Sequence, residues 1–195
     1  MGEFGLNEVF GILSVLITVV MFVFYIRDIL SNKFKPHPFS WFLWLVITAT
    51  IFLAQLTDGA GPGAWMNGVV TFFNLIIFTL SLKYRNSVIE KIDIVVLILA
   101  ATAILLWIAT STPLYAVVLL SIALTLAYIP TLRKAYSKPY EESIYLFSLG
   151  LVRQALTILA MDNMTLVTIL SPAVLIVDCI IVTSFILWRR YKVKP

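Results

Sequence analysis

Long apolar runs alternate with short polar breaks along the whole chain. A helix needs about 20 apolar residues to cross the roughly 30 Å hydrocarbon core of a bilayer. Seven runs meet or approach this length, and they cover residues 8–29, 38–57, 62–83, 93–110, 113–130, 142–161 and 165–188. Several breaks carry a proline, which a helix tolerates in its first turn. The pattern therefore predicts seven transmembrane helices, with the shortest break at residues 110–112.

The composition points to the same class of protein. Apolar residues make up 61% of the 195 positions and charged residues only 12%, whereas soluble domains carry roughly 25% charged residues. The polar surface is too small to cover a water-soluble globule, so we expect an all-α integral membrane protein. A single cysteine, Cys179, excludes a disulfide scaffold, and a single histidine, His37, excludes a multi-histidine metal site.

The basic residues fall at alternate breaks. If the N-terminus is outside, the inside loops and the C-terminal tail hold 13 of the 14 lysines and arginines, and the outside loops hold none. Cytoplasmic loops of membrane proteins carry this excess. The net charge of +4 is thus a topology signal and gives no reason to expect nucleic acid as a partner. We expect a multi-pass protein of the cell membrane, with the N-terminus outside and the C-terminus in the cytoplasm.

A shift of 103 residues aligns the chain with itself and gives six identities, without a gap, in the 22 positions from 25 to 46. The matched residues are Tyr25, Ile26, Lys35, Pro36, Ser40 and Leu43, with Tyr128, Ile129, Lys138, Pro139, Ser143 and Leu146. The shift crosses four spans and so preserves orientation. This predicts two parallel three-helix repeats, 1–91 and 112–195, joined by a linker helix at 92–111. Transporters built from parallel repeats bind substrate at the repeat interface near mid-depth.

This three-one-three arrangement resembles the SWEET sugar transporters and the wider PQ-loop (MtN3-like) superfamily. The closer likeness is in residues 128–138, Tyr-Ile-Pro-Thr-Leu-Arg-Lys-Ala-Tyr-Ser-Lys, followed by Ser143. They are similar to the family's helix-end proline, basic loop and serine. The first repeat has Arg27-Asp28 in place of the family's proline-glutamine pair, and Thr131 replaces the glutamine in the second. The resemblance implies alternating access between the repeats, with Pro130 as a hinge.

Two further features bear on this interpretation. Pro172 lies inside the last span and should bend it, which makes it a second candidate hinge. Nicotinamide riboside permeases have a similar architecture and often carry paired tryptophans, as Trp41 and Trp44 are paired here. Tryptophan near the end of a span is also a common interfacial anchor, so both roles stay open.

Polar residues follow one face of the third span, where Asn67, Thr71, Asn74 and Ser81 are separated by four, three and seven positions. As structural groups they would hydrogen-bond between helices. As functional groups they would line a substrate path. In SWEET proteins an asparagine on the third span and another on the seventh flank the sugar, and Asn74 matches the first of these.

Two charged side chains are predicted near the middle of the bilayer, Arg153 on the sixth span and Asp178 on the seventh, and Gln154 lies beside the arginine. An unpaired charge at this depth costs about 2.5–3.5 kcal/mol on insertion scales. An ion pair between the two is therefore expected. It either fixes the two spans together as structure or faces the central cavity and binds substrate.

These features predict a transporter or facilitator of a small polar solute, sugar-like or vitamin-like, that works by alternating access. The candidate substrate-binding residues are Asn74, Asp178, Arg153, Gln154, Asn67 and Thr71. We expect no catalytic residues, metal or cofactor, because the spans hold no carboxylate pair and no nucleophile–base constellation. The alternative is a seven-helix receptor or sorting protein on the same scaffold. The sequence leaves open whether the chain forms a homo-oligomer.

Overall fold

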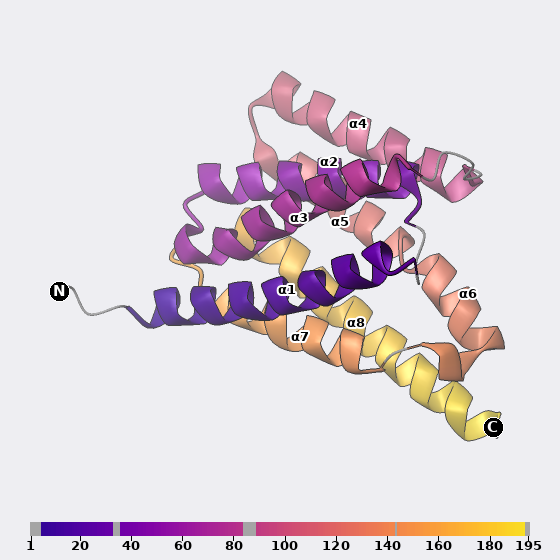
Figure 1. Cartoon of the computed structure of the whole chain (residues 1–195). Helices are drawn as coiled ribbons and strands as arrows, with labels where there is room; N and C mark the ends of the chain where they lie inside the picture. The colour runs from indigo at the N-terminus through magenta and orange to yellow at the C-terminus, as the bar shows by residue number, and fades with distance from the viewer. Residues whose placement is uncertain (1–4, 33–35, 84–88, 143, 194–195) are drawn as a thin grey trace.

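The computed structural model describes residues 5–32, 36–83, 89–142 and 144–193, without the side chains at 130, 134 and 141. All of the regular structure in this part of the chain is helical, as expected from the sequence (Figure 1). The elements are α1 (Leu6–Leu30), α2 (Pro38–Thr57), the short 3₁₀ helix η1 (Gly61–Ala64), α3 (Trp65–Ser81), α4 (Lys91–Thr110), α5 (Pro113–Leu126), α6 (Ile129–Ser137), the 3₁₀ helix η2 (Pro139–Glu141), α7 (Ile144–Leu159) and α8 (Leu166–Lys192).

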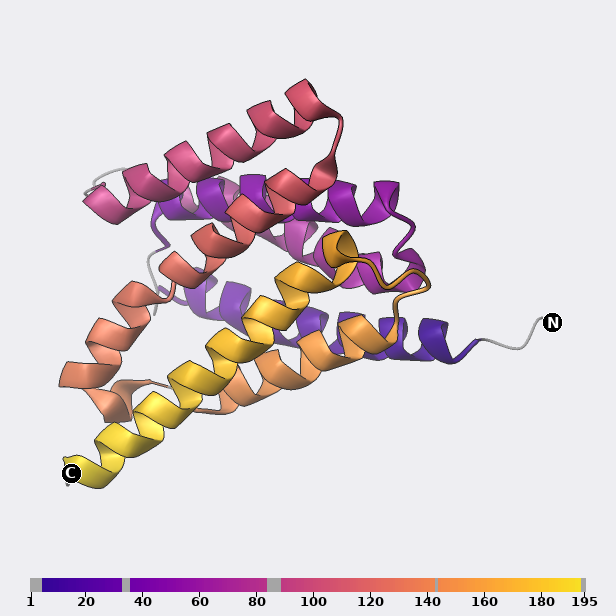
Figure 2. The ribbon, with the colours of Figure 1, turned by 180° about the vertical axis from the view of Figure 1, so that it is seen from behind.

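Six of the described helical segments are long and apolar enough to cross a membrane, with η1 counted together with α3 and α6 together with α5. The remaining apolar helix, α7, has 16 residues, which corresponds to about 24 Å at 1.5 Å per residue. The long apolar helices are compatible with a multi-pass membrane protein. The start of α1 and the end of α8 lie at opposite ends of the bundle in both views (Figures 1 and 2). We call these the N-terminal end and the C-terminal end of the bundle.

The predicted spans coincide with the helices to within a few residues, with one correction. Residues 131–141, predicted as a basic loop, instead form most of α6 and the short η2. Proline at the second position of α6 is compatible with a helix start, because the first turn needs no backbone donor there. The short break at 110–112 is confirmed: Ser111 adopts a left-handed conformation with φ of 52° and ends α4, and Pro113 begins α5.

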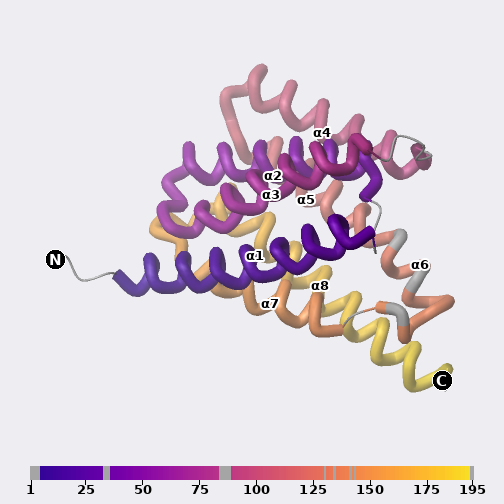
Figure 3. The backbone as a smooth tube through the Cα atoms, in the orientation of Figure 1, coloured from indigo at the N-terminus to yellow at the C-terminus, as the bar shows by residue number. Residues whose placement is uncertain are grey.

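The packing of the first three long helices has a counterpart later in the chain. α3 packs against both α1 and α2, and α8 packs against both α5 and α7. The first group of helices is thus α1, α2 and α3, and the second group is α5, α7 and α8. Contacts between the two groups join α1 to α7 and α2 to α5, and α4 lies against α2 and α5. The tube in Figure 3 shows α1 running alongside α7. Under the 103-residue shift α2 falls on α7 and α3 on α8, so equivalent helices make equivalent contacts.

At the N-terminal end the two groups of helices approach very closely. Gly61 has a positive φ of 56°, and a Cβ there would collide with the carboxylate of Asp162. A Cβ on Gly63 would lie 3.0 Å from Cα of Met161 and 3.1 Å from the carbonyl oxygen of Thr157. Because these neighbours include backbone atoms, they have little room to move. The contact between η1 and the end of α7 therefore requires glycine.

Gly63→Ala tests this contact. The added methyl group overpacks the junction, so we expect the variant to lose about 1–3 kcal/mol of stability, measured as thermal unfolding in detergent. The matched control is Gly5→Ala, because a Cβ on Gly5 meets no atom within 4 Å. Equal melting temperatures for the two variants would contradict the close approach.

Candidate solute-binding cavity

A cavity of about 180 Å³ lies between the two groups of helices. Its lining comes from α1, α2 and α3 on one side, and from α7, α8 and the end of α5 on the other. Apart from the aromatic residues, the polar side chains in the lining are Thr48, Asn67, Asn74, Arg153, Gln154 and Ser171. Four of these six, Asn67, Asn74, Arg153 and Gln154, are among the residues predicted from sequence as substrate-binding.

Aromatic rings form another part of the wall. Trp41 and Trp44, one turn apart on α2, both line the cavity together with Phe22 and Tyr128. The ring of Trp41 also packs against Tyr25, with centroids 5.3 Å apart. Both tryptophans thus border the cavity, where their rings offer flat apolar surface to a bound molecule.

The cavity holds polar atoms that lack partners. Oε1 of Gln154, Oγ of Ser171 and Nε of Arg153 are buried without a hydrogen bond within the described part of the chain. Gln154 is only 2% exposed and Ser171 only 1%. A buried polar atom without a partner costs about 1–3 kcal/mol. The fourth such atom, Oγ of Ser121, belongs to a different pocket between α5 and α8.

The two asparagines differ from these groups because their amides already have partners. Nδ2 of Asn74 donates to Oγ1 of Thr48 at 3.1 Å. Nδ2 of Asn67 donates to Oε1 of Gln55 at 2.8 Å, and Nε2 of Gln55 donates to the carbonyl oxygen of Thr168 at 3.0 Å. Gln55 is fully buried and so connects α2, α3 and α8. The amides of Asn67 and Asn74 therefore act in part as helix–helix contacts.

The ion pair expected between Arg153 and Asp178 does not form. The carboxylate of Asp178 accepts a hydrogen bond from Oγ1 of Thr125 at 3.1 Å, and Asp178 is not part of the cavity lining. The reason is the orientation of α8 about its own axis, which decides the neighbour that each of its side chains faces. Cys179 faces Gly150 of α7, where an added Cβ would lie 3.2 Å from its sulfur. Successive residues of a helix are turned by about 100°, so Asp178 faces α5 instead.

The remaining predicted residues are placed as follows. Thr71 lies outside the cavity lining, and its hydroxyl donates to the carbonyl oxygen of Asn67 at 2.8 Å. Pro172 is buried and lines the cavity, while α8 continues through it to Lys192. Pro130 belongs to α6, and its side chain lies outside the described residues. Sequence reasoning missed Thr48, Gln55 and Ser171, although each is a polar residue inside a predicted span.

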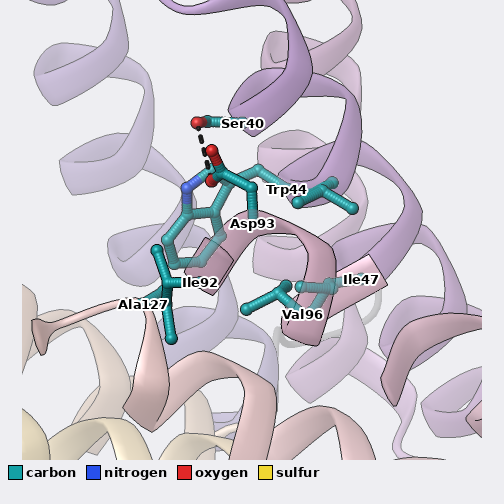
Figure 4. A pocket seen from close by; sticks show the side chains of 8 residues that line it. Ser40, Trp44, Ile47, Ile92, Asp93, Val96 and Ala127 are labelled. Carbon is teal, nitrogen blue, oxygen red and sulfur yellow. Dashed lines mark hydrogen bonds between the residues drawn. The ribbon is translucent and has the colours of Figure 1, made fainter. Parts of the chain in front are cut away.

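A second pocket, of about 100 Å³, lies where α2 and α4 begin (Figure 4). Oγ of Ser40 donates to Oδ1 of Asp93 at 3.4 Å. Nδ1 of His37 accepts from the backbone of Ser40, and Oδ2 of Asp93 accepts from the backbone of Glu90. These polar groups cap helix starts and join α4 to α2, so they are already satisfied. The larger cavity is therefore the stronger candidate site.

No protein-family model, curated protein or solved structure matches the chain. The candidate site therefore depends on the geometry of this chain alone.

Comparing two buried glutamines tests which polar groups hold the bundle together. Gln55→Met removes two hydrogen bonds, so Nδ2 of Asn67 and the carbonyl oxygen of Thr168 lose the partner that Gln55 supplies. We therefore expect a loss of about 1–3 kcal/mol of stability. Gln154→Met replaces a side chain for which the structure shows no hydrogen bond, and it should leave the stability of the ligand-free protein unchanged or higher. Thermal unfolding in detergent checks both variants, and equal destabilisation would contradict the unpartnered state of Gln154.

Proposed function

We propose that the protein is a membrane transporter or facilitator of a small polar solute, built as two parallel three-helix repeats around a central site. The repeats are 1–91 and 112–195, joined by a linker helix at 92–111, with the N-terminus outside and the C-terminus in the cytoplasm. The observation that carries the proposal is the cavity between the two groups of helices. Both groups contribute polar side chains to it, and Arg153, Gln154 and Ser171 there have buried atoms without partners.

The packing supports a repeat origin for this site. The 103-residue shift relates α1 to α5 and α7 to α2, and α1 contacts α7 just as α5 contacts α2. Two copies of one unit, related by an axis along the membrane normal, would make such a pair of contacts. Parallel repeats of this kind are a known transporter plan, with substrate bound between the halves. Together with the resemblance to SWEET and PQ-loop proteins, the packing favours alternating access over a purely anchoring role.

Alternating access requires that one end of the cavity close while the other admits solute. At the N-terminal end several hydrogen bonds join the proposed halves. Nδ2 of Asn7 donates to Asp162 at 2.9 Å, and the backbone of Asp162 donates to the carbonyl oxygen of Ala60 at 3.2 Å. Nδ2 of Asn163 donates to the carbonyl oxygen of Asp58 at 2.9 Å. These bonds and the close approach at Gly63 are what a closed outer gate would need.

Uptake into liposomes containing the purified protein tests the proposed activity. We expect at least one member of a panel of labelled sugars, amino acids and vitamins to enter faster than into protein-free liposomes. Gln154→Met should reduce that uptake by about tenfold, because one hydrogen bond to a bound solute contributes roughly 1.4 kcal/mol. Trp188→Leu, on the exposed surface of α8, is the control and should leave uptake unchanged.

If no solute enters and none raises the melting temperature, the transport proposal is wrong. Recovery of a stable protein partner by co-purification would then favour the receptor or sorting role.

Thiol labelling tests the closed end. In a Cys179→Ala background, Ser171→Cys places the only thiol in the cavity lining, since the chain has no other cysteine. We expect a membrane-impermeant maleimide to label it from the C-terminal side and not from the N-terminal side. Adding Asn7→Ala removes the hydrogen bond from Asn7 to Asp162, and adding Asp58→Ala removes the one that the hydroxyl of Thr165 donates to the carboxylate of Asp58. The two changes together should permit labelling from the N-terminal side. Labelling from that side without these changes would contradict a closed outer gate.

A further inference from the structure

We propose that the cavity selects a small organic anion, namely a carboxylate carried on a single ring. This inference rests on the proposed function and names the class of solute that the same site would take.

Charge is the first argument. Arg153 is the one acidic or basic side chain in the described cavity lining, because Asp178 is turned to Thr125 instead. The guanidinium of Arg153 makes no ion pair or hydrogen bond within the described part of the chain, and its Nε is buried. An unpaired cation among apolar helices is costly. A carboxylate is the group that guanidinium binds best, through two parallel hydrogen bonds. A neutral sugar would leave the positive charge unbalanced.

The size and the walls of the cavity give the second argument. Its volume is about 180 Å³, and an apolar cavity of about 150 Å³ is known to hold a benzene ring. There is thus room for one ring with small substituents. Phe22, Trp41, Trp44 and Tyr128 supply aromatic surface on the same cavity. Aromatic walls of this kind favour a flat partner through offset or edge-on packing.

The unpartnered oxygens give the third argument. Oε1 of Gln154 is a buried acceptor without a donor, and the hydroxyl of Ser171 can either donate or accept. A carboxylate only accepts hydrogen bonds, so it does not satisfy Oε1 of Gln154. A hydroxyl or N–H group elsewhere on the ring does so. The preferred solute therefore carries its charge at one position and a hydrogen-bond donor at another.

A matched pair of probes tests the proposal. 4-Hydroxybenzoate and 4-hydroxybenzamide have nearly the same size and share the ring and the hydroxyl, but only the first is an anion at pH 7. We measure binding of each to the purified full chain in detergent by calorimetry and by the shift in melting temperature. We expect the acid to bind at least about tenfold more tightly than the amide.

Substitutions of Arg153 test whether the preference for the acid over the amide arises in the cavity. Arg153→Gln should remove the preference for the acid, and Arg153→Lys should keep part of it, because lysine retains the charge but not the planar fork. Trp188→Leu, outside the cavity, should leave it unchanged. If Arg153→Gln does not fold, the relative affinities of the wild-type protein for the acid and the amide still test the proposal.

Equal affinity for the acid and the amide, a preference that persists in Arg153→Gln, or no binding of either probe would overturn the anion proposal. The uptake panel separates this failure from failure of the transporter proposal. Uptake of a neutral sugar without binding of 4-hydroxybenzoate would leave a transporter with a different substrate. Binding of 4-hydroxybenzoate without uptake of any solute would leave an anion site in a protein that does not transport.

Discussion

A polar side chain between apolar helices needs a hydrogen-bond partner, because neither lipid nor a dry helix interface supplies one. Most buried hydroxyls of this bundle bond to their own helix: Ser14 and Thr18 on α1 donate to carbonyl oxygens three and four residues earlier, as Thr50 does on α2. The buried amides of Asn67 and Gln55 pair across helices. Against this background the unpartnered atoms of Arg153, Gln154 and Ser171 stand out, and all three residues line one cavity.

The bundle packs closely at its N-terminal end and leaves a cavity further along. At the N-terminal end, glycines bring η1 against the end of α7, and the loop at 160–165 donates hydrogen bonds to the one at 58–60. Further along the bundle, larger side chains such as Trp44 border the cavity. Close packing at one end and separation in the middle are what a solute site reached from the other end would need.

The length of the apolar runs was sufficient to place every long helix, because a stretch of about 20 apolar residues has few other stable structures. The breaks at 58–61 and 110–112 were also readable from their glycine and serine residues and from Pro62 and Pro113, which follow them directly. Residues 131–141 were missed as a helix because α6 is amphipathic and charged and so gave no apolar run. The cavity residues on α3 and α7 were found because polar groups are rare in such spans, and the same rule applied more widely would have included Gln55 and Ser171.

The sequence by itself determined the helical class, the positions of the apolar helices and the presence of a few polar groups within them, since each of these follows from local composition and spacing. Only the tertiary structure decided which polar groups meet. Arg153 and Asp178 lie on neighbouring helices, yet Cys179 occupies the face of α8 that packs on α7, and the carboxylate turns to Thr125. Rotation of a helix about its axis is set by packing against all of its neighbours at once, and neither depth nor spacing along one helix reveals it.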